Sequence, residues 1–136
     1  MRIFISYKFR GVDGSNLKKK LKEISSILEK NGHQTILYFR DKENWQTRNF
    51  PPGKVIKEAF EEIRECDAVF AFIDHKETSE GMLLEIGYAK ALNKKIILLI
   101  SKKLPFPTLE AIADKVLKFS NSKDLNKKLE NYRVTN

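Results

Sequence analysis

The sequence has few of the residues that build disulfide frameworks, metal centres or membrane spans. Its 136 residues include one cysteine, Cys66, and two widely separated histidines, His33 and His75. A single cysteine excludes an internal disulfide, and we expect it to be a small buried residue. The three residues do not form a metal-binding pattern. No apolar run approaches the length of a membrane span, and the N-terminus passes directly into a strand pattern, unlike a signal peptide. We therefore expect a cytoplasmic protein without a metal.

Acidic residues are also in the minority, with 18 Asp and Glu against 26 Lys and Arg, for a net charge of +8. The lysines form four clusters: Lys18-Lys19-Lys20, Lys94-Lys95, Lys102-Lys103 and Lys127-Lys128. Acidic residues are interleaved with them, which indicates solvated surface, and a positive field also favours a small anionic substrate. There is no nucleic-acid recognition motif and no basic stripe with aromatics, so polymeric nucleic acid is not an expected partner.

Strand-like and helix-like segments alternate along the chain. The predicted strands are Arg2–Tyr7, Gln34–Phe39, Ala68–Ile73, Ile96–Ile100 and Val116–Phe119. The predicted helices are Asn16–Lys30, Lys54–Arg64, Gly81–Leu92, residues 108–115 and residues 123–132. This alternation predicts an α/β fold with a parallel sheet between helical layers. The length is that of one domain, which we place at residues 1–132 with a loose tail at 133–136.

The order of these elements predicts a flavodoxin-like three-layer sandwich with five parallel strands in the order 2-1-3-4-5. The switch point of such a sheet lies between the first and third strands, and ligands bind beyond their carboxyl ends. Those ends carry residues 7–11 and 74–85. The only long irregular stretch is Arg40–Gly53, and long loops in compact domains are often functional.

The most informative stretch is Ser79–Ala89, where the third strand passes into a helix. Ser79 and Gly81 stand at the turn, and Glu85 lies about one turn inside the helix. Free backbone N–H groups and the helix dipole favour an anion at such a place, so we expect a carboxylate there to stay ionised. The alternative is that Glu85 is a surface acid and that Gly81 and Gly87 allow close helix–sheet packing.

The pattern Ser-x-Gly-x-x-x-Glu-x-Gly-x-Ala after a buried strand resembles the nucleoside 2-deoxyribosyltransferase superfamily. The resemblance is concentrated in residues 67–100, with support from residues 1–11 and the order of elements. The superfamily includes base-exchanging transferases and hydrolases of nucleoside 5′-monophosphates. The resemblance implies that Glu85 is the nucleophile that attacks the anomeric carbon, that no cofactor is needed, and that the protein is a homodimer.

The resemblance also suggests how the substrate is held. Where this chain has Ser79, the transferases commonly have an acid at the sugar 5′-hydroxyl, whereas the hydrolases have a serine at the 5′-phosphate. A carboxylate repels a phosphate, so Ser79 with Gly81 favours a nucleoside monophosphate. Arg10 and Gly11 follow the first strand, and the planar fork of Arg10 suits a phosphate. The alternatives are that Ser79 is an ordinary helix N-cap and that Arg10 only faces solvent.

Three further residues are candidates for the chemistry. Tyr7 is a candidate to hydrogen-bond Glu85 or the sugar; the alternative is buried bulk at a strand end. Asp74 is a candidate to orient a sugar hydroxyl or to help protonate the base; the alternative is a cap on the following turn. His75 offers acid–base chemistry at neutral pH, or is simply solvated.

Aromatic residues near the predicted site are candidates to stack on the base. Trp45, with Phe39 and Phe50 nearby, lies in or beside the long loop, and Phe9 follows the first strand. Aromatic stacking binds bases with little demand on their identity. Packing of the loop onto the domain is the alternative for Trp45.

The chain departs from the superfamily pattern on the helix before the third strand. An additional aspartate is frequent there, but this chain has Ala59-Phe60-Glu61-Glu62. Glu61, Glu62 or Asp74 are the candidates to replace it. The superfamily also often completes its site with a residue of a neighbouring subunit after the fourth strand, for which Ser101 and Thr108 are the candidates.

The sequence therefore predicts an N-glycosidase that hydrolyses the base–sugar bond of nucleoside or deoxynucleoside 5′-monophosphates. One alternative is base exchange between deoxynucleosides through the same nucleophile. The opening strand Ile3-Phe4-Ile5-Ser6-Tyr7 is similar to that of TIR domains, which cleave NAD or act as signalling adaptors. A TIR-like protein or a nucleotide-binding module is therefore another alternative.

Overall fold

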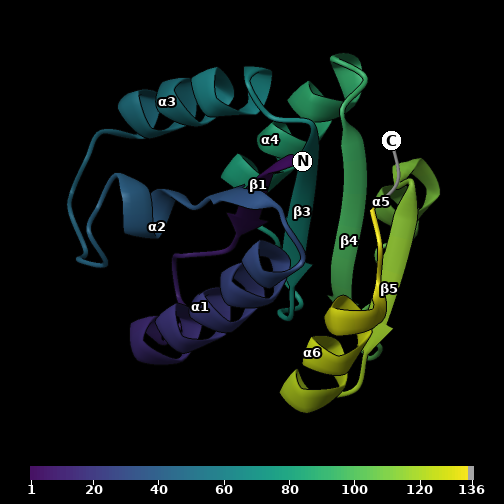
Figure 1. Ribbon diagram of the computed structural model, residues 1–136. Coiled ribbons are helices and arrows are strands. Elements are labelled where there is room, and N and C mark those ends of the chain that lie inside the picture. Colours follow the sequence, from purple (N-terminus) through teal and green to yellow (C-terminus); the bar gives the residue numbers. More distant parts are fainter. Residues whose placement is uncertain (135–136) are drawn as a thin grey trace.

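The computed structural model describes residues 1–134 and shows one parallel sheet between two layers of helices (Figure 1). The strands are β1 (Arg2–Tyr7), β2 (Gln34–Ile36), β3 (Ala68–Ile73), β4 (Lys95–Ser101) and β5 (Lys115–Phe119). The helices are α1 (Gly14–Lys30), α2 (Tyr38–Asp41), α3 (Pro52–Arg64), α4 (Glu80–Ala91), α5 (Pro107–Ile112) and α6 (Ser122–Asn131). The five strands pair in parallel in the order β2-β1-β3-β4-β5, which confirms the predicted fold class.

Each face of the sheet is apolar and covered by its own helices. Because side chains alternate along a strand, Ile3 and Phe70 pack on one face against α1 and α6, and Phe4 and Val69 pack on the other against α3 and α4. Both β3 and the centre of β4 are buried throughout, as expected of central strands in a doubly covered parallel sheet. The two faces matter for function because they decide which side chains meet at the carboxyl edge.

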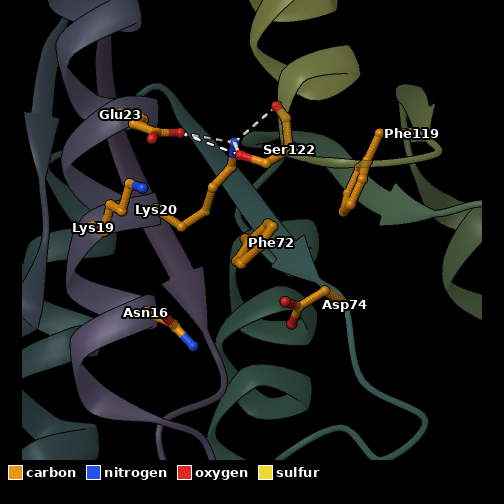
Figure 2. A pocket seen from close by; sticks show the side chains of 8 residues that line it. All are labelled: Asn16, Lys19, Lys20, Glu23, Phe72, Asp74, Phe119 and Ser122. Carbon is orange, nitrogen blue, oxygen red and sulfur yellow. Dashed lines mark hydrogen bonds and ion pairs between the residues drawn. The ribbon is translucent and has the colours of Figure 1, made fainter.

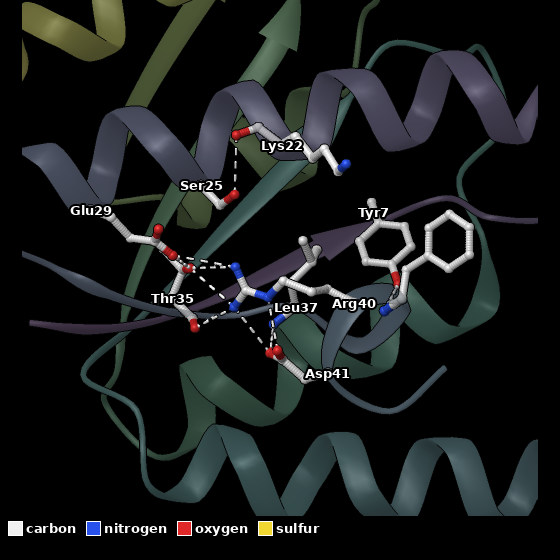
Figure 3. A network of polar contacts seen from close by, with 9 residues as sticks. Tyr7, Lys22, Ser25, Glu29, Thr35, Leu37, Arg40 and Asp41 are labelled. Atoms are coloured by element: carbon white, nitrogen blue, oxygen red, sulfur yellow. Dashed lines mark hydrogen bonds and ion pairs between the residues drawn. The ribbon is translucent and has the colours of Figure 1, made fainter. Parts of the chain in front are cut away.

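The second predicted strand is shorter than expected. Strand β2 ends at Ile36, and α2 begins at Tyr38, whereas the apolar run predicted a strand to Phe39. The following polar side chains take the backbone groups that a strand would use (Figure 3). An Asp41 carboxylate oxygen accepts from the Leu37 N–H at 2.8 Å, and the Arg40 guanidinium donates to the Thr35 carbonyl at 2.8 Å. Periodicity alone does not detect this kind of competition.

Other boundaries shift by a few residues. Helix α1 begins two residues early because an Asp13 carboxylate oxygen accepts from the N–H groups of Ser15 at 2.9 Å and Asn16 at 3.2 Å, an N-cap. The helix predicted at residues 108–115 is also shorter than expected, since α5 ends at Ile112. Of the predicted loose tail, Val134 packs partly against the core, and residues 135–136 lie outside the described part of the chain. Among the helices of residues 1–134, none is long and apolar enough to cross a membrane.

Candidate active site

Glu85 projects from α4 toward the carboxyl end of β1. There its Oε1 accepts a 2.6 Å hydrogen bond from the Oγ of Ser6. Ser6 is 1% exposed and lies on the sheet face that α4 covers. Sequence reasoning named Glu85 but missed Ser6, although a signal was present: Ser6 is a polar residue within an apolar strand. A buried hydroxyl needs a partner, and here that partner is the predicted nucleophile.

Burial changes the ionisation of Glu85. Desolvation raises the pKa of its carboxyl to about 7, and the hydrogen bond from Ser6 partly offsets this effect. The expectation that the helix N-terminus keeps this carboxylate ionised is therefore wrong near neutral pH, where an appreciable fraction is protonated. The physical reason is position, because Glu85 lies beyond the first turn of α4 and the influence of the dipole fades within that turn. A carboxyl that titrates near pH 7 is typical of catalytic sites.

The N-terminus of α4 is capped but remains open to a ligand. The Oγ of Ser79 accepts from the Met82 N–H at 3.1 Å, so Ser79 is the N-cap, and its own proton can still be donated. A Cβ built on Gly81 would meet only Ser79 Oγ at 3.9 Å, and one on Gly87 would meet nothing within 4 Å. The glycines are therefore not required for close helix–sheet packing, which argues against that alternative. Gly81 instead leaves the first turn uncovered.

Tyr7 ends β1 on the opposite face of the sheet from Ser6. Its hydroxyl oxygen accepts from the Phe39 N–H at 2.7 Å (Figure 3), rather than bonding Glu85 directly. Burial raises the pKa of Tyr7 well above its usual value, and the carboxylates of Glu43 and Glu85 add to the effect. Tyr7 therefore stays a neutral phenol whose hydroxyl lies within electrostatic range of both carboxylates.

The loop after β1 carries Arg10 and Gly11. Arg10 is exposed and, within residues 1–134, has no hydrogen-bond or ion-pair partner. Gly11 has φ of +75°, in the left-handed region that glycine tolerates best. Arg10 is thus a free cation on the same edge of the sheet as Ser79.

Asp74 lies apart from Glu85. It follows the last residue of β3 and lines a hollow of about 310 Å³ between α1 and α6 (Figure 2). Its carboxylate is 2.7 Å from His75 Nδ1, and burial raises the pKa of Asp74 while His75 and Lys20 partly offset the effect. Glu85 is not among the lining residues of this hollow. The sequence expected both acids at one edge, but the two sheet faces separate them.

The aromatic candidates form a packed row. The Phe39 ring makes edge contacts with Phe9 at 5.1 Å and with Trp45 at 5.3 Å, measured between ring centroids. The ammonium groups of Lys18 and Lys22 lie 5.6 and 5.5 Å from the Trp45 ring centroid, so this ring rests beside α1. The arrangement agrees with the packing alternative, and base stacking by Trp45 or Phe9 stays a prediction.

The position of the frequent aspartate on α3 is not filled by its neighbours. Ala59 is fully buried, and Glu61 is exposed. A Glu62 oxygen lies 3.1 Å from the guanidinium of Arg2, a residue that begins β1 at the amino edge of the sheet, far along the strand from Tyr7. Neither Glu61 nor Glu62 therefore contributes a side-chain contact to the site around Glu85 in the described residues.

The remaining chemical groups have structural explanations. Cys66 is buried, as expected, and burial raises the pKa of its thiol to about 11. His33 lies 3.1 Å from the N-terminal amine. Within residues 1–134 no three His, Cys, Asp or Glu side chains gather as metal ligands would.

The fold and the site define a class: an α/β protein of flavodoxin-like topology with a half-buried carboxyl group at the switch point, next to the N-terminus of a helix. The chain belongs to the nucleoside 2-deoxyribosyltransferase family, whose sequence model matches residues 8–131. This confirms the resemblance seen in the sequence.

Solved structures agree with this assignment. The CMP N-glycosidase of Clostridium botulinum is 26% identical with a TM-score of 0.72, over 97% of this chain and 100% of that chain. A 2-deoxyribosyltransferase of Bacillus psychrosaccharolyticus is 19% identical with a TM-score of 0.74, over 98% and 93% of the two chains, and shows the shared fold. No curated protein sequence matches the chain. Together the comparisons support glycosidase or transferase activity on nucleosides without separating the two.

Proposed function

We propose that this protein hydrolyses the base–sugar bond of nucleoside 5′-monophosphates, with Glu85 as the nucleophile. The observation that carries the proposal is the Ser6–Glu85 hydrogen bond of 2.6 Å, which holds a half-buried carboxyl beside the N-terminus of α4. The raised pKa of Glu85, about 7, marks a group that the fold stabilises poorly as an anion. Such a group is retained for chemistry more readily than for stability.

In the proposed reaction a Glu85 oxygen attacks the anomeric carbon as the base departs with the electrons of the N-glycosidic bond and takes up a proton. The resulting glycosyl ester is then attacked by water, which releases the sugar phosphate and restores the carboxylate. Ser6 orients the carboxylate through its hydrogen bond. Tyr7, held by the Phe39 N–H, is the proposed donor toward the sugar or the carboxylate.

The 5′-phosphate is proposed to bind at the start of α4. Helix N-termini bind anions through free N–H groups and the dipole, and Ser79 contributes a hydroxyl rather than a repelling carboxylate. Arg10, exposed and unpaired in the described residues, and the turn at Gly11 lie on the same sheet edge and are proposed to close on the phosphate. Asp74 keeps its proposed role at a sugar hydroxyl, although the structure shows no hydrogen bond or ion pair between it and Glu85 within residues 1–134.

The relatives bear on the choice between hydrolysis, base exchange and a TIR-like function. The Clostridium botulinum relative, a CMP N-glycosidase, supports hydrolysis of a nucleotide, whereas the Bacillus psychrosaccharolyticus relative keeps base exchange as the second candidate. The family match over residues 8–131 favours both over the TIR-like alternative. A dimer is part of the proposal, with Ser101 or Thr108 of the second subunit at the site, as is a cytoplasmic location.

The test is chromatography of free base released from ribo- and deoxyribonucleoside 5′-monophosphates, the matching nucleosides and NAD. We expect wild-type protein to release base from monophosphates, and Glu85→Ala to lower the rate by about 10³-fold or more because the covalent route is removed. Glu130→Gln, an exposed change on α6, is the matched control and should retain full activity.

Other outcomes separate the alternatives. Release from nucleosides only when a second base is added would establish a transferase, and cleavage of NAD alone would restore the TIR-like alternative. A folded protein that releases no base from any substrate would contradict the proposal.

A further inference from the structure

A second carboxyl group is buried near the site, and the mechanism above does not use it. Glu43 follows α2 and is 8% exposed. Its Oε2 accepts only one hydrogen bond within residues 1–134, a long one of 3.4 Å from the Arg48 N–H. A carboxylate has about four acceptor sites, and a buried charge with so few donors is costly. This side chain therefore has unused acceptor capacity.

The backbone around Glu43 directs it inward. The Glu43 N–H bonds the Tyr38 carbonyl at 3.3 Å, and the Trp45 N–H bonds the Phe39 carbonyl at 2.7 Å. Between these bonds the chain turns through Asn44 and Trp45, whose φ values of +51° and +60° are unusual for residues with side chains. The turn ties Glu43 to α2 rather than leaving it on the mobile surface of a loop.

A buried hydroxyl beside Glu43 also lacks a partner. Tyr38 is 7% exposed, and within the described residues its hydroxyl makes no hydrogen bond. Burial, with smaller contributions from the carboxylates of Glu58 and Glu43, raises the pKa of Tyr38 to about 12, so its proton stays available for donation. An unpartnered hydroxyl and an under-used carboxylate in one place indicate that a polar ligand completes the cluster.

The cluster adjoins the nucleophile through Tyr7. The Tyr7 hydroxyl accepts a 2.7 Å hydrogen bond from the N–H of Phe39, the residue after Tyr38, and the residue before Tyr7, Ser6, holds Glu85. A bound nucleotide whose anomeric carbon meets Glu85 has its base a few ångströms further on. The cluster of Tyr7, Tyr38 and Glu43 therefore adjoins the carboxyl end of β1, where Glu85 is held.

We propose that Glu43 and Tyr38 bind the edge of the nucleobase and select bases that carry an exocyclic amino group. A carboxylate accepts from an amino group of cytosine, adenine or guanine, whereas the corresponding carbonyl oxygen of uracil or thymine faces it with a lone pair. The Tyr38 hydroxyl donates to a neighbouring ring nitrogen or carbonyl. This inference rests on the proposed function and names its substrate class.

The experiment measures kcat/KM for the 5′-monophosphates of cytidine, adenosine, guanosine and uridine with wild type, Glu43→Gln and Tyr38→Phe. Affinities of the same compounds are measured by calorimetry with Glu85→Ala as the background. Glu43→Gln keeps a carbonyl acceptor but removes its charge, and hydrogen bonds to charged groups are about twice as strong as neutral ones. The variant should therefore lower kcat/KM and affinity for amino-bearing bases by about five- to tenfold. For the uridine compound, kcat/KM and affinity should change by no more than about twofold.

The ratio of kcat/KM for amino-bearing substrates to kcat/KM for the uridine compound distinguishes base binding from a merely structural role. A structural defect lowers kcat/KM for all substrates together and leaves this ratio unchanged. Tyr38→Phe removes a hydroxyl that has no partner, so folding is retained, and it should give a smaller loss. Glu130→Gln should leave the ratio unchanged.

Four outcomes keep this inference separate from the proposed function. Base release with an unchanged substrate ratio in Glu43→Gln overturns the inference and leaves the hydrolase. Binding without base release, with selectivity lost in Glu43→Gln, supports the inference and overturns the hydrolase. Base release whose selectivity falls in Glu43→Gln supports both. A folded protein that neither binds nor cleaves any of the compounds overturns both.

Discussion

Glu85 occupies a position in the fold that disfavours the ionised form of its carboxyl group. Its carboxyl is raised to a pKa of about 7 by burial, although Ser6 donates to it and α4 begins one turn earlier. Desolvation therefore outweighs the hydrogen bond and the dipole, as expected for a group beyond the first turn. The fold holds a charge where it is poorly solvated, which has a consequence for stability.

That consequence is a pH-dependent difference between wild type and Glu85→Gln. The folded protein holds the Glu85 proton more tightly than the unfolded chain, whose pKa is near 4.5, so the contribution to stability is complete below about pH 4.5 and is lost as the pH rises through 7. A shift of this size corresponds to about 3 kcal/mol. We expect the stability of Glu85→Gln relative to wild type to increase by up to about 3 kcal/mol between pH 4.5 and 8, in urea unfolding.

The control for this measurement is Glu130→Gln, which makes the same chemical change at an exposed position of α6. A Glu85→Gln difference that does not vary with pH, or that varies no more than the control, would show that the surroundings of Glu85 do not raise its pKa.

At the scale of elements, the first two turns of α4 carry both the helix cap and the proposed binding groups. Ser79 caps the helix, Gly81 leaves the N-terminus uncovered, and Glu85 reaches the end of β1 from the next turn. The whole arrangement depends on the parallel pairing of β1 with β3, which places Tyr7 opposite Phe72 and so brings the two carboxyl ends together.

A prediction at this scale concerns Gly81→Ala. Alanine is favoured over glycine in a helix by up to about 1 kcal/mol, and its Cβ would meet only Ser79 Oγ at 3.9 Å, so thermal stability should be unchanged or slightly higher. If the phosphate binds over this turn, the added methyl group should raise KM for monophosphates by about tenfold, with a smaller effect on kcat. Steady-state kinetics and a thermal melt check both parts.

Gly53→Ala is the matched control, because Gly53 occupies the equivalent place in the first turn of α3 and a Cβ there meets nothing within 4 Å. An unchanged KM in Gly81→Ala would contradict the proposal that the phosphate binds at the N-terminus of α4.

At the scale of the whole molecule, the outer side of α4 is apolar where a solvated helix would be polar. Leu83, Leu84 and Leu92 are 45%, 55% and 40% exposed, and Gly87 is exposed beside them. The stacked rings of Phe60 and Tyr88, 4.3 Å between centroids, adjoin this surface. A helix that is apolar on both sides is normally buried on both sides, which supports the proposed homodimer through α4.

We expect the double variant Leu83→Glu with Leu84→Glu to be monomeric, since paired subunits would bury four like charges in one interface. Analytical ultracentrifugation at micromolar concentration measures the change, and Lys127→Glu on the opposite layer is the control. If Ser101 or Thr108 of the second subunit completes the site, base release should fall together with the dimer. A monomeric wild type would contradict the proposal.

The sequence determined a large part of this protein by itself. Local periodicity located β1, β3 and α4 at or within a residue of their observed bounds, and the alternation of elements led to the strand order, because parallel sheets with right-handed crossovers leave few arrangements. The pattern of residues 79–89 resembles the family that the comparisons confirm. All of these features depend on residues close to one another in the chain.

Only the tertiary structure decided which distant groups meet. It paired Ser6 with Glu85 across 79 positions, placed Asp74 on the other face of the sheet, and turned Tyr38 and Glu43 inward where a strand and an open loop were expected. It also decided ionisation, since the pKa of Glu85 depends on the packing around it. The reason is that sheet face, burial and long-range hydrogen bonds arise from packing between elements, which no local pattern of residues records.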